Sequence, residues 1–358
     1  MIERTNNSRL LQLRRLQDEC IGIFIGAGTS SDSIESIKVP QWSELLSEML
    51  SGLRLEKSEP SPNEYLAIAG LIEKHMKEEI IESIQIYFSD VGIVYPEHVY
   101  ADIVQSIATA RMAEYIYFLL TKYPFSPDDA KLKENSTLDA IIKVCTKRVE
   151  QKKQTVIVNY NFDDFLEYFL KEEIGESNIE IHFYQGNNSN LEGGVAALLR
   201  RNKRPVNIIY VHGKVNLLTQ DKIIPFQPSL IISQQNYDTL FQTVVNFTNQ
   251  LQYLIMLSIP SIAIGFSCDD PNFRQLRNHI LSTNGSLPPF FVLKFCESSD
   301  SKCPNENNCV QNMRVLKEML ELYGLIPIIA NRSVYTSTIE NLFGLSTNSI
   351  YCTLQCNR

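Results

Sequence analysis

The chain has 358 residues, which is enough for one large α/β domain or two smaller ones. Its formal net charge is −8 at pH 7, and this argues against a general nucleic-acid-binding protein, which is usually basic. Residues 8–18 mix leucines with arginines, a pattern typical of an amphipathic helix and not of a signal peptide. The most apolar later stretch, residues 251–266, is broken by Pro260 and is too short for a membrane span. We therefore expect a soluble cytoplasmic protein that binds neither membranes nor nucleic acid directly.

The first stretch with the pattern of a buried strand, residues 20–25, ends in a glycine-rich turn. Gly26 and Gly28 allow the backbone to turn tightly and to approach a ligand without an intervening Cβ atom. Thr29 and Ser30 follow at a point where a helix can begin. The turn suits the pyrophosphate of a dinucleotide, although a plain strand-to-helix turn has the same pattern.

A long block of helical pattern follows the first strand. Residues 65–88 and 99–123 carry apolar residues at helical spacing, with interruptions at Asp90-Val-Gly and Tyr95-Pro. This block interrupts the alternation of strands and helices. We therefore predict a helical insertion subdomain over residues 55–135, set into one Rossmann-like domain formed by residues 1–54 and 136–358.

Strands and helices alternate from residue 136 onward. We expect helices over residues 136–150, 162–171, 236–257 and 312–323, and one that begins at Pro271 with Asp270 as its N-cap. The expected strands lie over residues 155–158, 179–184, 206–211, 261–265, 289–295 and 325–329. This pattern predicts an α/β fold, with a Rossmann-like parallel sheet, helices on both of its faces and the helical insertion.

Polar residues that suit chemistry follow four of the predicted strands. They occupy positions 26–30, 159–164, 212–214 and 265–267. In an open parallel sheet, ligands bind outside the carboxyl ends of the strands. The four polar strand ends therefore predict a single binding site.

This combination of motifs resembles the sirtuin family. The motifs are Gly-Ala-Gly-Thr-Ser at 26–30, Asn-Phe-Asp at 161–163, His-Gly at 212–213 and Gly-Phe-Ser at 265–267. The resemblance implies that Asn161 and His212 are catalytic and that NAD is the substrate. It also implies that NAD is bound by Gly26, Ala27, Gly28, Thr29, Ser30, Asp163, Gly265, Phe266 and Ser267. For Asp163, capping of the following helix is an equally open alternative.

The chain departs from protein-deacylating sirtuins in two ways. Those enzymes carry two Cys-x-x-Cys pairs for a structural zinc, whereas this chain has none, and we expect no metal. Its Val-Pro-Gln-Trp-Ser-Glu-Leu-Leu segment at 39–46 takes the place of the family's Pro-Asp-Phe-Arg segment. With the insertion and the Asn-Phe-Asp-Asp-Phe-Leu-Glu motif at 161–167, the chain is similar to the sirtuin-like domains of bacterial antiphage defence systems, which hydrolyse NAD.

The resemblance implies an NAD glycohydrolase that cleaves the nicotinamide–ribose bond to give nicotinamide and ADP-ribose, as the NAD-depleting effector in abortive infection. It also implies that a homo-oligomer, a HerA-type ATPase or an Argonaute-like partner switches the activity on. A histidine can accept a proton near neutral pH, and an asparagine amide can hold ribose hydroxyls and water. Two alternatives stay open: an NAD-dependent protein deacylase or ADP-ribosyltransferase, and a non-catalytic regulatory subunit that binds NAD or ADP-ribose.

Overall fold

The computed structural model describes residues 20–31, 33–35, 72, 74–82, 130–183, 204–218, 231, 247–268, 270–283, 287–296, 318, 320–331 and 335–345. The helix expected over residues 8–18 and most of the predicted insertion, 55–135, lie outside the described residues. Inside the insertion, residues 74–82 are helical. The division of the chain at residues 54 and 136 stays a prediction.

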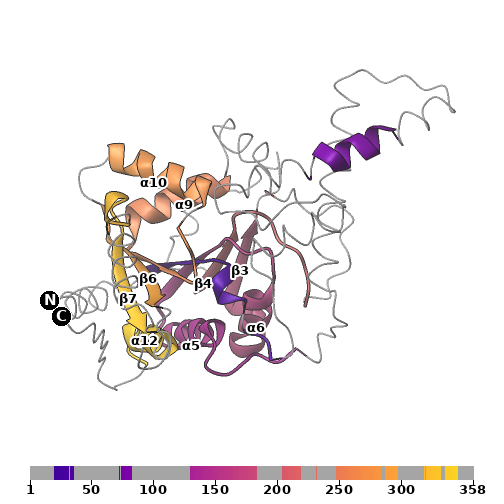
Figure 1. Ribbon diagram of the computed structural model, residues 1–358. Coiled ribbons are helices and arrows are strands. Elements are labelled where there is room, and N and C mark those ends of the chain that lie inside the picture. The colour runs from indigo at the N-terminus through magenta and orange to yellow at the C-terminus, as the bar shows by residue number, and fades with distance from the viewer. Residues whose placement is uncertain are drawn as a thin grey trace, which may run out of the picture.

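A seven-stranded, all-parallel sheet forms the centre of the fold (Figure 1). Its strands are β1 (Cys20–Ile25), β2 (Gln154–Asn159), β3 (Ile179–Phe183), β4 (Val206–Tyr210), β5 (Ser261–Ile264), β6 (Phe290–Cys296) and β7 (Ile326–Asn331). They lie in the order β3-β4-β2-β1-β5-β6-β7. Strands β2, β3 and β4 therefore lie on one side of β1, and the later strands β5, β6 and β7 lie on the other side. The strand order reverses between β1 and β5, which is the topological switch point.

Helices cover both faces of the sheet, as the sequence predicts (Figure 1). One face carries α5 (Thr137–Glu150), α6 (Phe165–Ile174) and α12 (Tyr335–Leu342), and the other carries α9 (Phe247–Ser258) and α10 (Pro271–Thr283). A separate hydrophobic cluster fills each layer. Ile23 and Ile25 of β1 belong to one cluster and Phe24 to the other, because successive residues of a strand point to opposite faces.

Most of the expected elements that the structure describes lie close to their predicted bounds. Residues 236–246 of one expected helix, and residues 312–317 and 319 of another, lie outside the described residues. Helix α6 differs from its prediction, since it begins at Phe165 and not at residue 162. The preceding polar residues form a turn at the sheet edge instead. The helix that begins at Pro271 is confirmed, and Asp270 Oδ1 accepts a hydrogen bond of 3.0 Å from Phe273 N. Helix α12 is absent from the sequence prediction, although its buried Tyr335 and Ile339 are one helical turn apart. Two short 3₁₀ helices, η1 (Ala27–Thr29) and η4 (Glu176–Asn178), are also additional.

The turns that follow β1 and β5 contact each other at the switch point. Gly28 N donates a hydrogen bond of 3.0 Å to Gly265 O. Gly265 has a φ of +60°, a left-handed conformation that favours glycine. A Cβ atom on Gly265 would lie 2.7 Å from Thr29 N, and one on Gly28 would lie 2.8 Å from Gly265 O. Each glycine is therefore required by the close approach of the other turn.

We predict that Gly265→Ala destabilises the protein more than Gly344→Ala. Gly344 also has a positive φ, +72°, but no atom lies within 4 Å of its Cβ position. Gly344→Ala should therefore lower the free energy of unfolding by about 1 kcal/mol, through backbone strain alone. Gly265→Ala should lower the free energy of unfolding by about 1–3 kcal/mol more, because its Cβ atom overlaps the neighbouring turn. Urea unfolding of the two variants measures the difference, and equal losses would contradict the close approach of the two turns.

Candidate functional site

The four motif-bearing turns lie at one edge of the sheet. Ile25 pairs with both Asn159 and Ile264, and Asn159 also pairs with Tyr210, so β1, β2, β4 and β5 end at the same level. Tyr160 N donates a hydrogen bond of 3.0 Å to Ile25 O and ties the second turn to the first strand. The strand register therefore brings the predicted site residues to a common edge.

Asn161 joins the turn after β2 to the glycine-rich turn after β1. Its Nδ2 donates to Thr29 Oγ1 at 3.1 Å and to Ser30 Oγ at 2.9 Å, across about 131 residues of chain. Its backbone N donates to Asn159 Oδ1 at 2.8 Å, which fixes the turn. Thr29 Oγ1 in turn donates to Gly26 O at 2.7 Å. The predicted catalytic amide is thus buried and held by two of the predicted cofactor-binding residues.

Asp163 lies buried beside this contact. Burial is the main cause that raises the pKa of its carboxyl to about 7, and the charge of Asp164 raises the pKa further. Hydrogen bonds from Ser30 and from Phe165 N act in the opposite direction. The bond from Phe165 N, at 3.3 Å, shows that Asp163 receives a backbone amide at the start of α6. Asp163 lies one residue before the N-cap of α6, which is Asp164, and a contact of Asp163 with NAD stays a prediction.

His212 lies buried in an aromatic environment after β4. The centroid of its ring is 5.2 Å from that of Tyr160, with the rings edge to face, and 6.2 Å from that of Phe162. Its Nε2 atom is 3.4 Å from Asp270 Oδ2. Burial lowers the pKa of His212, and the charge of Asp270 offsets only part of this effect. The imidazole is therefore neutral at pH 7 and has one nitrogen that can accept a proton.

Phe266 packs against this aromatic group from the turn after β5. Its ring stacks on that of Tyr160, with centroids 4.3 Å apart and planes 25° apart, and it is buried. The Phe266 ring therefore has a packing role that supports Tyr160 and, through it, His212. Ser267, the next residue, is exposed at the same edge.

Two side chains that the sequence analysis missed hold the turn after β5. The Tyr335 hydroxyl, from α12, accepts a hydrogen bond of 3.1 Å from Gly265 N. Lys294 Nζ, from β6, donates to the carbonyl oxygens of Phe266 and Ser267 at 2.9 and 3.0 Å. A signal for Lys294 is present in the sequence, because it is the one charged residue of an otherwise apolar strand.

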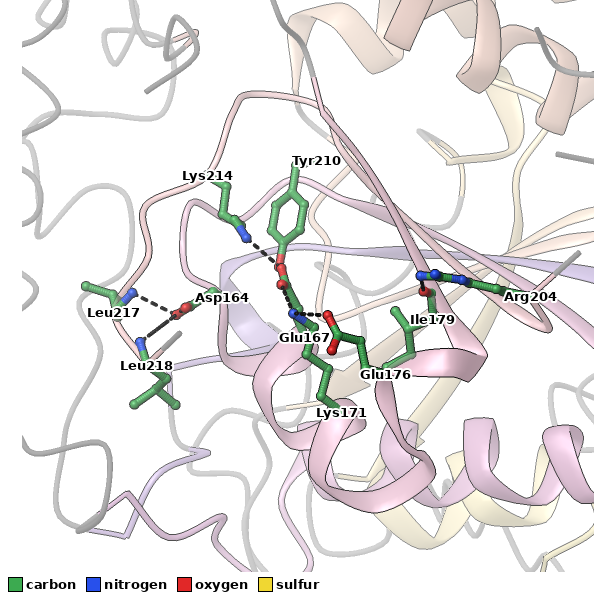
Figure 2. A network of polar contacts seen from close by, with 10 residues as sticks. All are labelled: Asp164, Glu167, Lys171, Glu176, Ile179, Arg204, Tyr210, Lys214, Leu217 and Leu218. Carbon is green, nitrogen blue, oxygen red and sulfur yellow. Dashed lines mark hydrogen bonds and ion pairs between the residues drawn. The ribbon is translucent and has the colours of Figure 1, made fainter. Parts of the chain in front are cut away.

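A polar network, shown in Figure 2, holds the turn after β4 against the start of α6. The buried Asp164 carboxylate accepts hydrogen bonds from the backbone N atoms of Leu217, at 2.9 Å, and Leu218, at 3.1 Å. Val215 N donates to Phe162 O at 2.6 Å. These bonds fix the segment that follows His212.

Glu167 is the second carboxylate of this network. It is 2% exposed and lies 2.8 Å from Lys214 Nζ and 2.9 Å from Lys171 Nζ. The Tyr210 hydroxyl donates to it at 3.4 Å. Lys214 follows His212 by two residues, and Glu167 belongs to the same motif as Asn161, so the network couples the two motif-bearing turns (Figure 2).

Within the described part of the chain, no three His, Cys, Asp or Glu side chains are grouped so that they could hold a metal ion. Cys303 and Cys309 lie outside the described residues. A search of the described helices for a membrane span finds none that is long and apolar enough.

Comparison with known families shows that residues 155–316 match the model of the SIR2-like domain. No curated protein matches the chain. The matched region contains the turns of Asn161, His212 and Gly265 but begins after β1. Strand β1 lies outside the matched region, but it pairs with both β2 and β5 and contributes the glycine-rich turn.

We predict that Glu167→Gln destabilises the protein by about 3 kcal/mol, because Lys171 and Lys214 lose a buried counter-charge. The matched control is Glu150→Gln, which removes an exposed partner 3.0 Å from Lys147 and should change stability by less than about 0.5 kcal/mol. Urea unfolding at pH 7 measures both variants. Similar values for the two would mean that the Glu167 network does not stabilise the fold.

A second prediction concerns the pH dependence of stability. The folded-state pKa of Asp163, about 7, lies above its ordinary value of 3.8, so the folded protein holds this proton more tightly than the unfolded chain. The free energy of unfolding should therefore fall as the pH rises from about 4 to about 7. Between pH 5 and pH 8, the wild type should lose more stability than Asp163→Asn, whose amide does not titrate. Identical pH profiles would contradict the raised pKa.

Proposed function

Because residues 155–316 match the model of the SIR2-like domain, we propose that this protein is an NAD glycohydrolase. It cleaves the bond between the nicotinamide nitrogen and ribose C1′ of NAD and releases nicotinamide and ADP-ribose. The observation that carries the proposal is the contact of Asn161 Nδ2 with Thr29 and Ser30. This contact supports a single site in which the amide lies beside the glycine-rich turn.

The residues at the switch point fit a dinucleotide. Gly28 is exposed and carries no side chain, so a pyrophosphate can approach the backbone of its turn. The amide of Asn161 and the hydroxyl of Ser30 are groups that can bond to ribose hydroxyls. Ser267 is exposed on the neighbouring turn and adds a further hydroxyl at this edge.

The reaction breaks the C1′–N1 bond, and its electron pair goes to the nicotinamide ring, which leaves as a neutral molecule. The oxygen of a water molecule forms the new bond to C1′ and loses a proton. NAD⁺ and water thus give nicotinamide, ADP-ribose and one proton. We assign the orientation of the ribose and the water to Asn161. We assign acceptance of the water proton to His212, whose lowered pKa keeps it neutral and able to act as a base.

Unchecked NAD hydrolysis is toxic to a cell, so the proposed activity needs a switch. We propose that the cytoplasmic protein acts in antiphage defence and is switched on by assembly, either as a homo-oligomer or with a HerA-type or Argonaute-like partner. This part of the proposal rests on the sequence resemblance. The mass of the purified assembly and NAD turnover with and without the product of a neighbouring gene test it.

We predict that Asn161→Ala and His212→Ala each lower NAD turnover by about 10²–10⁴-fold, because each removes a group assigned to the reacting atoms. The matched control is His279→Ala, since His279 is an exposed histidine on α10 and should leave turnover unchanged. Chromatography of nicotinamide and ADP-ribose measures the reaction.

The products also separate the other NAD-dependent functions. Release of deacetylated peptide with O-acetyl-ADP-ribose would indicate a deacylase, and ADP-ribosylated protein would indicate a transferase. Tight binding of NAD without any product, in every assembly tested, would indicate a regulatory subunit and would overturn the proposed hydrolysis.

A further inference from the structure

The two carboxylate oxygens of Asp270 contact different groups. Oδ1 accepts the hydrogen bond of 3.0 Å from Phe273 N at the start of α10. Oδ2 lies 3.4 Å from His212 Nε2. The exposed fractions of the two side chains are 11% for Asp270 and 6% for His212, so the pair is largely shielded from water. The helix start therefore orients the carboxylate toward the imidazole.

Capping of α10 alone does not require an aspartate. Asn and Ser cap helices about as well as Asp, and each needs only one acceptor oxygen for this task. The second oxygen of Asp270 instead places a negative charge beside a buried histidine. A buried charge is unfavourable unless it is paired or hydrogen-bonded, and the contact with His212 gives the Asp270 carboxylate a neighbour that helix capping does not require.

A carboxylate beside a neutral imidazole determines where the imidazole proton resides. Ionised Asp270 can only accept hydrogen bonds, and neutral His212 carries one N–H group. The proton is therefore held on Nε2, and Nδ1 is the nitrogen that can accept a proton. We propose that Asp270 is a positioning residue for His212, which fixes the orientation and the tautomer in which Nδ1 is the base. The inference rests on the proposed hydrolysis for its effect on turnover.

The two aromatic side chains that contact His212 differ from Asp270 in charge. Tyr160, after β2, contacts the ring edge to face, and burial raises the pKa of its phenol well above the ordinary value, so it stays neutral. Phe162, from the same turn, is apolar. Asp270, at the start of α10, is the group whose charge acts on the pKa of His212.

Two substitutions separate positioning from capping. In Asp270→Asn, the single side-chain oxygen is taken by the helix cap, and the NH₂ group faces Nε2, which draws the imidazole proton to Nδ1. In Asp270→Ser, the cap is kept and the carboxylate oxygen that faces Nε2 is removed. We expect Asp270→Asn to lower kcat for NAD by about 100-fold or more and to leave KM little changed, as a wrong tautomer does. Asp270→Ser should lower kcat by about 10-fold, within the ordinary range for general-base effects.

The matched control is Asp139→Asn. Asp139 is also a carboxylate at the start of a helix, where it accepts a bond of 2.8 Å from Asn135 N and pairs with Lys143, but it lies in α5. Its kcat should equal that of the wild type. If Asp270 were only a cap, Asp270→Asn would retain full turnover, and so would Asp270→Ser, because both residues keep the cap. Either result overturns the inference.

The tautomer is measured independently of turnover. The ¹⁵N chemical shifts of His212, assigned with His212→Ala and recorded at pH 8, should show Nε2–H in the wild type and Nδ1–H in Asp270→Asn. The same tautomer in both proteins would overturn the positioning role, whatever the turnover. A wild type that shows Nε2–H but does not hydrolyse NAD in any assembly would instead overturn the proposed function and leave the Asp270–His212 contact established.

Discussion

The parallel pairing of β1 with both β2 and β5 is the constraint on which the site depends. Strand β1 is buried on both faces, and its partners end in register with it. The turns beyond those ends are joined by the hydrogen bond from Gly28 N to Gly265 O. Once the sheet is formed, the amide of Asn161 meets the hydroxyls of Thr29 and Ser30 as a consequence of strand register.

The Asn-Phe-Asp-Asp-Phe-Leu-Glu segment divides into residues that face the site and residues that hold it. Asn161 contacts the glycine-rich turn, whereas Asp164 and Glu167 bind the segment after His212. A buried carboxylate is tolerated only with partners, and these two have backbone amides and lysines respectively. The motif thus combines chemistry and support within seven residues. Asp164 and Glu167 bind groups of the protein itself, so an acidic residue in this motif is not by itself a sign of ligand contact.

The layering of the fold and the edge that carries the site could be predicted from the sequence, because apolar runs and the polar residues after them are local patterns. Tyr335 and Lys294 could not be found in this way, since their role is to bond backbone atoms of a turn that is distant in sequence. Asp270 was readable as a helix cap from Asp-Pro alone, but its contact with His212 depends on how β4 and β5 are placed in the sheet. The start of α6 at Phe165 similarly reflects a turn shaped by Thr29 and Ser30.

The position of β1 in the sheet also determines when its two strand pairs can form during synthesis. Ile25 is synthesised early, but its partner Ile264 follows roughly 240 residues later, which takes on the order of 10–50 s on a ribosome. Until then, the central strand has an unpaired edge, and the turn after it has no Gly265 to pack against. A growing chain therefore contains Asn161 and His212 well before the site around them is complete, and an incomplete chain lacks the assembled site.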